Sequence, residues 1–245
     1  MIKKDNIYKT PVYLLAPGGK EYTRTAGMLT DLRPEAAVVE AGCGMGSTAV
    51  GLAENFGCTV EAFDLYQDFI DRGETYASMR KVTEQVRFHC GDIMQCLDRD
   101  KRFDLAVAEG GALTAVNDRR EVLDLLYQTI KPGGYLYLSD LLVHPWAPEP
   151  VTEYYSHLNT MTEQRYRTLL AELNFDITFT CFLSEQAWDN YFVALNQALS
   201  RKIGFLGKAE VARKVGQEEE LYYKHGGCHS LECLMIIARK IENKK

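Results

Sequence analysis

The sequence predicts an α/β fold, a doubly wound sheet of seven strands. Three observations lead to this prediction. Short apolar runs alternate with longer segments of helical periodicity, a glycine-rich loop separates one such run from the helix after it, and acidic residues end successive apolar runs. Strands that alternate with helices form mainly parallel sheets. The 245 residues, 46% of them hydrophobic and 25% charged, are enough for one domain with a full core.

The N-terminal segment predicts helical structure in front of the first strand. Residues 1–15 are apolar and aromatic with little periodicity, which favours a helix or an arm, and Ala16-Pro17-Gly18-Gly19 interrupts it. A helix is then predicted over residues 22–32, because Ala26, Leu29 and Leu32 fall on one side. On these residues alone, the segment could equally be a helical hairpin on the surface.

The pattern with most information is residues 38–50, Val-Val-Glu-Ala-Gly-Cys-Gly-Met-Gly-Ser-Thr-Ala-Val. A strand ends in Glu40, a helix is predicted over residues 47–56, and the loop between them has glycine at every second position, Gly42, Gly44 and Gly46. Glycines let the backbone approach a ligand, and free N–H groups at a helix start favour negative groups. The spacing G-x-G-x-G differs from the G-x-G-x-x-G dinucleotide fingerprint. Alone, it also suits a plain strand-to-helix turn.

Acids end the next three predicted strands. Strand two, residues 59–64, ends in Asp64, and an acid about 20 residues beyond such a loop accepts ribose hydroxyls in this type of fold. Strand three, residues 86–89, is followed by Gly91-Asp92-Ile93, and strand four, residues 102–109, ends in Glu109. Asp64 could instead cap a helix, Asp92 could be a turn residue and Glu109 could be a solvated loop acid.

The C-terminal half predicts three more strands. A helix over residues 119–130 and the break Lys131-Pro132-Gly133-Gly134 precede strand five, 135–140. An aromatic, proline-rich stretch, 141–161, leads to a helix near 161–173 that Thr160 and Glu163 cap. The remaining predicted elements are strand six at 176–183, helices at 184–203 and 208–223, and strand seven at 232–239. Residues 184–226 thus form a helical insertion between strands six and seven, a candidate cap over a pocket or homodimer surface.

Five pieces in order carry a resemblance to class I S-adenosylmethionine (SAM)-dependent methyltransferases. They are Glu-Ala-Gly-Cys-Gly-Met-Gly at 40–46, Phe63-Asp64, Gly91-Asp92, Ala108-Glu109-Gly110 and Lys131-Pro132-Gly133-Gly134. The C-terminal half resembles bacterial methyltransferases of unassigned substrate, with broader kin in ubiquinone and menaquinone biosynthesis. The resemblance implies a single Rossmann-like domain, 1–245, whose last strand is antiparallel. It has an N-terminal helical lid (1–34), a SAM-binding core (35–140) and acceptor-side elements (141–245).

The resemblance also implies roles for individual residues. Glu40 would face the amino group of the methionine moiety, Asp64 the ribose and Asp92 the adenine amino group. The full set of expected cofactor-binding residues is Glu40, Gly42, Cys43, Gly44, Gly46, Asp64, Leu65, Gly91, Asp92, Ile93 and Glu109. The lid candidates are Tyr13, Pro17 and Gly18. The catalytic candidates are Glu109, where strand four meets the transferred methyl, and His144, as a general base if the acceptor must lose a proton.

Absent motifs and charge favour a small-molecule acceptor, methylated by in-line displacement. The Asp/Asn-Pro-Pro-aromatic motif of amino-methylating DNA enzymes is replaced at strand four by Glu109-Gly110-Gly111-Ala112, and no Pro-Cys dipeptide for cytosine attack is present. A net charge of −6 without a basic stripe does not suit nucleic acid. No secretion signal or membrane-length apolar run is visible, so a cytoplasmic protein with seven reduced cysteines is expected.

Three alternatives stay open at this point. The chain could bind SAM without catalysis. It could be a nicotinamide-dependent oxidoreductase, although the glycine spacing disfavours this and the pair Tyr127-x-x-x-Lys131 ends a helix away from the expected site. The cluster His225, Cys228, His229 and Cys233 contains the residue types of zinc sites, but its spacing matches no familiar one, so no metal is expected.

Overall fold

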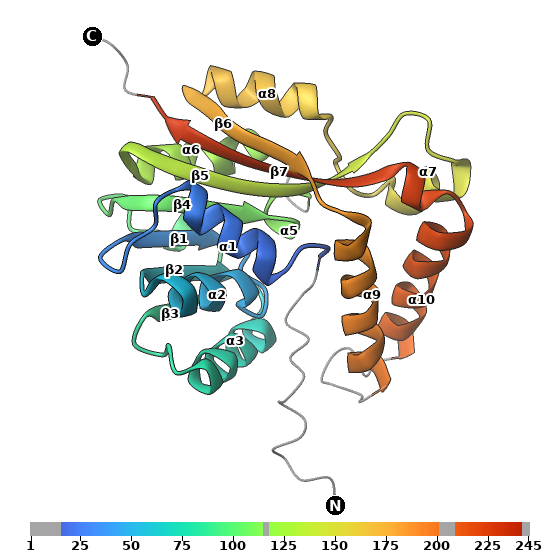
Figure 1. Cartoon of the computed structure of the whole chain (residues 1–245), viewed down its shortest axis with the longest axis horizontal. Coiled ribbons are helices and arrows are strands. Elements are labelled where there is room, and N and C mark those ends of the chain that lie inside the picture. The colour runs from blue at the N-terminus through green and yellow to red at the C-terminus, as the bar shows by residue number, and fades with distance from the viewer. Residues whose placement is uncertain (1–15, 115–117, 201–208, 242–245) are drawn as a thin grey trace, which may run out of the picture.

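The computed structural model describes residues 16–114, 118–200 and 209–241. It confirms a seven-stranded sheet in the order β3-β2-β1-β4-β5-β7-β6 (Figure 1). The strands are β1 Ala37–Ala41, β2 Thr59–Asp64, β3 Val86–Cys90, β4 Phe103–Glu109, β5 Ile130–Val143, β6 Phe175–Phe182 and β7 Leu231–Lys240. β7 pairs antiparallel with both β5 and β6, and the pairs among β1 to β5 are parallel, as predicted.

Helices cover both faces of the sheet, which explains the apolar runs of the central strands. Because side chains alternate along a strand, Val38 packs in one hydrophobic core and Val39 in the other. The first core includes residues of α2 Ser47–Phe56 and α3 Gln67–Arg80, and α1 Lys20–Leu29 packs on α2. The second core includes residues of α6 Arg119–Thr129 and α8 Glu163–Glu172. The remaining short helices are α4 Ile93–Cys96, α5 Gly111–Thr114 and α7 Glu149–Tyr155.

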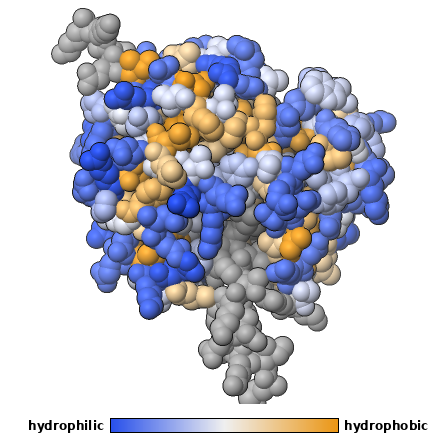
Figure 2. Space-filling model, in the orientation of Figure 1, coloured by the Kyte–Doolittle hydropathy of each residue, from blue (hydrophilic) through white to orange (hydrophobic). Residues whose placement is uncertain are grey.

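The predicted insertion forms a helical hairpin beside the sheet (Figure 1). Its helices are α9 Glu185–Ser200 and α10 Ala209–Lys224, and the 3-10 turn Gly227–His229 leads into β7. Aromatic side chains join the two helices: the ring of Trp188 stacks on Tyr222 at a centroid distance of 4.6 Å. Figure 2 shows hydrophilic residues over most of this side of the molecule, with hydrophobic residues gathered near the region of β6.

The predicted bounds of α1 and of β5 and the predicted start of α8 were wrong. The Lys131–Gly134 break lies inside β5, because Ile130 pairs with Phe103 and the strand resumes at Tyr135 after an irregularity in β4. β5 also continues to Val143, which pairs with Leu231 on β7. The helix α8 begins after Thr162, whose hydroxyl accepts from the Arg165 N–H at 3.3 Å, so Thr160 is not its cap.

Candidate active site

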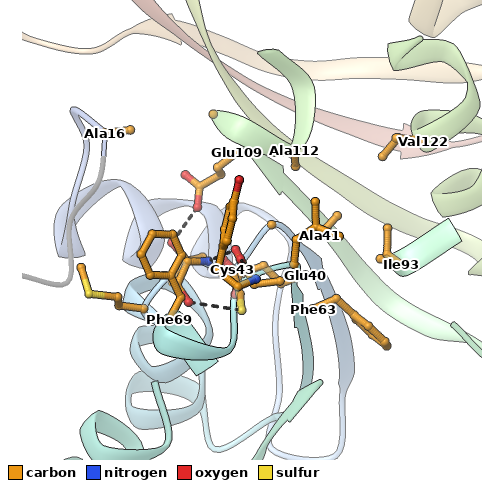
Figure 3. Close-up of a pocket in the computed structure, with 18 of the residues that line it drawn as sticks. Ala16, Glu40, Ala41, Cys43, Phe63, Phe69, Ile93, Glu109, Ala112 and Val122 are labelled. Carbon is orange, nitrogen blue, oxygen red and sulfur yellow. Dashed lines mark hydrogen bonds between the residues drawn. The ribbon is translucent and has the colours of Figure 1, made fainter. Parts of the chain in front are cut away.

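A cavity of about 600 Å³ opens where the chain leaves the carboxyl ends of β1 to β4. The strand order reverses between β1 and β4, and ligands of open α/β sheets bind beside such a reversal. The lining comes from residues 16–19, the β1–α2 loop, the ends of β2, β3 and β4, and the first turn of α6. Figure 3 shows Ala16 and Glu109 on one side of this cavity and Ile93 and Val122 on the other.

The glycine loop requires its glycines for two different reasons. Gly42 has a φ of +68°, and a Cβ there would lie 2.8 Å from the Ala112 Cβ, across the cavity wall. Gly46 has a φ of +78° and faces Phe88, which a Cβ would meet at 2.7 Å. Gly42, Cys43 and Gly44 line the cavity, whereas Gly46 is not among its lining residues. The first glycines therefore shape the ligand side of the loop, and Gly46 allows α2 to pack.

Glu40 carries an unsatisfied acceptor at the cavity wall. The side chain is only 3% exposed, and its Oε2 has no hydrogen-bond partner among the described residues. Burial raises the pKa of Glu40 well above its ordinary value of 4.5, and the nearby Glu109 raises it further, whereas the Ala49 N–H opposes the shift. A buried acceptor without a donor is costly, so the cavity is prepared for a ligand with N–H groups.

Glu109 is held in one orientation by two hydroxyl groups. Its Oε2 accepts from Thr48 Oγ1 at 2.6 Å, and its Oε1 accepts from the Tyr137 hydroxyl at 2.5 Å. Burial raises the pKa of Glu109, and these two hydrogen bonds counteract the shift. Thr48 lies in the first turn of α2 and Tyr137 in β5, so rigid elements position the carboxyl group.

Asp64 joins the second strand to the glycine loop. Its carboxylate accepts from the Gly44 N–H at 2.8 Å and from the Tyr66 N–H at 3.0 Å. The alternative role as the N-cap of α3 is not observed, because Tyr66 occupies that position. Asp64 and the neighbouring Leu65, which is 64% exposed, both line the cavity. The carboxylate thus orders the loop and still faces the space where a ligand would lie.

The third strand contributes a helix cap that also faces the cavity. Asp92 accepts from the Met94 N–H at 2.9 Å and caps α4, so its turn role is observed. Gly91, Asp92 and Ile93 all line the cavity. Gly91 has a φ of +154°, and a Cβ there would lie 2.6 Å from Cys96 Sγ. Capping occupies one carboxylate oxygen, which leaves acceptor capacity for a ligand.

The segment before α1 covers the end of the cavity near β4. Of the residues predicted to form a lid, Pro17 and Gly18 line the cavity, and Tyr13 lies outside the described residues. Tyr22, in the first turn of the following helix α1, accepts a hydrogen bond from the Ser184 N–H at 2.8 Å. The start of α1 and the residue before α9 are therefore joined directly, although 162 residues separate them.

The structure does not bring His144 to the other candidates. Its Nε2 lies 2.7 Å from Glu232 Oε2, its ring stacks on Trp146 at 4.1 Å, and it is not among the residues that line the cavity. Sequence reasoning missed Thr48 and Tyr137. The position of Thr48, two residues after Gly46 at the start of a predicted helix, could have indicated that it belongs to the site. No sequence pattern pointed to Tyr137, because its contact with Glu109 depends on the pairing of β4 with β5.

The other two groups of residues considered from the sequence, the Tyr127–Lys131 pair and the histidine and cysteine cluster, do not line the cavity. Lys131 pairs with Asp104 at 2.8 Å, so the Tyr127–Lys131 pair takes no part in the cavity. Within the described residues, no three His, Cys, Asp or Glu side chains are arranged to hold a metal ion. Across the same part of the chain, no helix has the length and apolar character needed to span a membrane.

Residues 38–134 match the family model described as a methyltransferase domain. These residues contain the glycine loop, Asp64, Asp92 and Glu109, which are the elements that form the cavity. Residues 38–134, which are less than half of the chain, thus form a class I methyltransferase domain. SAM is accordingly its cofactor, and this methyltransferase domain accounts for the strand order and for the site at the β1–β4 reversal. The finer likeness to enzymes of ubiquinone and menaquinone biosynthesis stays a prediction.

The known proteins that resemble this chain match it over different lengths. A phosphoethanolamine N-methyltransferase of Arabidopsis thaliana is 29% identical over 136 residues, 56% of this chain and 27% of that protein. An O-methyltransferase of Pyrenophora dematioidea is 28% identical, over 51% of this chain and 48% of its own length. A SAM-dependent methyltransferase of Thiobacillus denitrificans, solved with S-adenosylhomocysteine, superposes with a TM-score of 0.74 at 21% identity, over 97% of this chain and 98% of that one. The chain thus spans half or less of these two curated relatives, and the solved structure shows a shared fold.

The residues of the methyltransferase cavity fit SAM in their chemistry. The unpartnered Glu40 Oε2 suits an ammonium group, which supplies the missing donor and opposite charge. The Asp64 carboxylate suits two vicinal hydroxyls, and Asp92 suits an amino group. A side chain at Gly42 would collide with Ala112, so glycine is needed where the loop lines the cavity. Three acids at three strand ends therefore match three donor groups of one ligand.

Proposed function

We propose that this protein transfers a methyl group from SAM to a small-molecule acceptor. The observation that supports it best is the pair Glu40 and Glu109, which face one cavity at the reversal of a methyltransferase sheet. Glu40 would hold the methionine ammonium group, Asp64 the ribose and Asp92 the adenine amino group. Bound SAM supplies a methyl group that its sulfonium makes electrophilic.

The protein itself would position the acceptor and exclude water. Glu109 stands at the end of the cavity that the 16–19 segment covers: a Cβ on Gly110 would lie 3.8 Å from the Ala16 Cβ. An acceptor held there by Glu109, in line with the methyl, would gain from proximity and orientation. His144, paired with Glu232 outside the cavity, has no part in this proposal.

The acceptor is a small molecule in this proposal for two reasons. A cavity of about 600 Å³ lies within the range of small-molecule sites. Its lining carries carboxylates, which repel a nucleic-acid backbone. The names of the relatives cover both N-methyltransferases and an O-methyltransferase, so they do not distinguish the attacking atom.

The test combines calorimetry with a turnover assay. We expect SAM and S-adenosylhomocysteine to bind with one site per chain and NADH not to compete, and labelled SAM to give a methylated product from a library of small metabolites. Tighter binding of NADH than of SAM would support the oxidoreductase alternative. Tight SAM binding without turnover of any library compound would support a SAM-binding protein without catalysis.

A further inference from the structure

We propose that the methyl acceptor is a small amine, and that the Glu109 carboxylate receives its N–H group. This inference rests on the proposed function and makes the acceptor class specific. Its basis is the charge of the side chains that line the cavity, the orientation of Glu109, and the acceptor positions that the hydrogen bonds of Glu109 leave free.

The cavity wall is acidic throughout. Six carboxylates line it: Glu40, Asp64, Asp92, Glu109, Asp118 and Glu121. Among its lining residues in the described part of the chain, none is Lys, Arg or His. An acceptor with a phosphate or carboxylate group would meet no cationic side chain among these residues and would face several carboxylates, which disfavours its binding. A cationic or hydrogen-bond-donating acceptor is favoured by the same side chains.

Glu109 is the partly buried carboxylate that remains for the acceptor, because Asp118, the cap of α6, and Glu121 are both exposed. Asp64 ends β2, Asp92 follows β3, and Glu40 is the next-to-last residue of β1, before the glycine loop. The chemistry of these three carboxylates matches the cofactor. Figure 3 shows Glu109 toward Ala16, away from Ile93 and Val122. Asp92 adjoins Ile93 in the chain. The lid side of the cavity therefore has its own carboxylate, separate from those on the nucleoside side.

The surroundings of Glu109 leave room for one more donor. Each carboxylate oxygen accepts one hydroxyl, from Thr48 at 2.6 Å and from Tyr137 at 2.5 Å. A carboxylate has about four acceptor positions, so two remain. An ammonium acceptor can supply an N–H donor to one of these positions together with a positive charge.

Glu109 also suits the proton that N-methylation releases. The ammonium acceptor first passes one proton to the Glu109 carboxylate, which frees the lone pair of the nitrogen. That lone pair forms the new bond to the methyl carbon, and the electron pair of the breaking carbon–sulfur bond stays on sulfur, so the methylated nitrogen is again positively charged and Glu109 holds the one proton that was released. Burial raises the pKa of Glu109, and a carboxylate with a raised pKa holds a proton more strongly and is a better general base. An alcohol could also donate a hydrogen bond to Glu109, but unlike an ammonium group it brings no positive charge to balance the carboxylate.

The experiment measures binding to the protein loaded with S-adenosylhomocysteine. The probes are matched amines, alcohols and carboxylates on ethyl, isobutyl and benzyl skeletons, followed by saturation-transfer NMR and calorimetry. At least one amine should bind about tenfold or more tightly than its matched alcohol, as for a charged hydrogen bond, and no carboxylate should compete. Glu109→Gln should abolish this preference. Tyr137→Phe, which keeps the charge and removes one donor, should retain it.

Glu218→Gln is the matched control. Glu218 is also partly buried and accepts from two hydroxyls, those of Tyr155 at 3.0 Å and Tyr191 at 3.1 Å, but it is not among the cavity lining residues. It should leave the amine preference unchanged. Carboxylate binding equal to amine binding, an unchanged preference in Glu109→Gln, or no bound amine on any skeleton would overturn the amine assignment. If the unmodified protein does not bind SAM, the proposed function itself is wrong. If it methylates alcohols but no amine, only the assignment of an amine acceptor is wrong.

Discussion

Glu40 and Glu109 place two carboxyl groups on one cavity without a cation among the described lining residues. Burial raises the pKa of each above the ordinary value of 4.5, so the ligand-free protein retains protons on this pair to higher pH than free glutamate would. A cationic ligand favours the ionised form. At the residue scale, we therefore expect binding of SAM to release protons from this pair.

The coupling predicts how SAM affinity depends on pH. A raised folded-state pKa gives a contribution to stability that is fully present below 4.5 and is lost as the pH rises through the folded-state value. As the pH rises from 4.5 through the folded-state pKa values, the ligand-free protein should therefore lose stability, whereas SAM affinity should increase.

Calorimetry in phosphate and in Tris, which differ in ionisation enthalpy, measures the protons released when SAM binds. Glu40→Gln should bind SAM more weakly and with a flatter pH dependence, and an unchanged slope would contradict the coupling.

Asp64 supplies a second prediction at this scale. Asp64→Ala removes the acceptor for the Gly44 N–H and the acceptor proposed for the ribose. SAM affinity should fall by roughly 1.5–3 kcal/mol, the value of a hydrogen bond to a charged group. Asp71→Ala is the control. The carboxylate of Asp71 lies on the exposed side of α3 and accepts from the Gln67 side-chain amide, so its loss should not affect the cavity. Equal affinities of both variants would remove Asp64 from the site.

At the scale of elements, the conformation of the β1–α2 loop determines the shape of the cavity wall. Its backbone turns through left-handed conformations at Gly42, Gly44 and Gly46, and the short α5 that follows β4 closes over the first of them. The Cys43 N–H donates to the Phe63 carbonyl at 2.9 Å and holds the loop to β2. The loop therefore has little freedom to adjust to a larger side chain.

Gly42→Ala tests this rigidity. The new Cβ would lie 2.8 Å from the Ala112 Cβ, and the φ of +68° is unfavourable for alanine by about 1–2 kcal/mol. SAM affinity should fall about tenfold, with a lower melting temperature. Gly216→Ala is the matched control: this glycine lies in α10 with nothing within 4 Å of a new Cβ. It should stabilise the protein by up to about 1 kcal/mol and leave SAM binding unchanged. Equal effects of the two substitutions would contradict the role of the loop.

At the scale of the whole molecule, one buried polar network joins three elements on the side of the sheet opposite α2. Arg119 of α6 contacts Asp140 of β5 at 3.4 Å and the Tyr166 hydroxyl of α8 at 3.0 Å, and Tyr166 also donates to Asp140. These residues are at most 3% exposed. Burial raises the Asp140 pKa to about 6, although Tyr166 and Arg119 oppose the shift. The network orients α6, which supplies part of the cavity wall.

Asp140→Asn leaves the Arg119 charge buried without its partner. At a pH well above the Asp140 pKa of about 6, the free energy of unfolding should fall by roughly 3–5 kcal/mol in urea denaturation. Glu172→Gln is the control, because Glu172 pairs with Arg120 between the same two helices but with about half of each side chain exposed. It should cost less than about 1 kcal/mol. A loss of similar size in both variants would show that burial does not determine the strength of these pairs.

The sequence by itself determined the features that depend on local chemistry. Gly46 and Gly57 bound α2, and both the predicted helix 47–56 and the predicted strand 59–64 have the observed limits. The glycine spacing and the acids at successive strand ends indicated the cofactor, because a parallel sheet brings those ends together. Such signals need only neighbours in the chain.

Tertiary structure decided the features that depend on partners far apart in the sequence. Register with β7 extended β5 to Val143, the pairing of β4 with β5 placed Tyr137 on Glu109, and Glu232, 88 residues from His144, holds that histidine away from the cavity. No local spacing encodes these contacts. They form because packing selects which side chains meet, and the cavity acquired its acidic lid side in the same way.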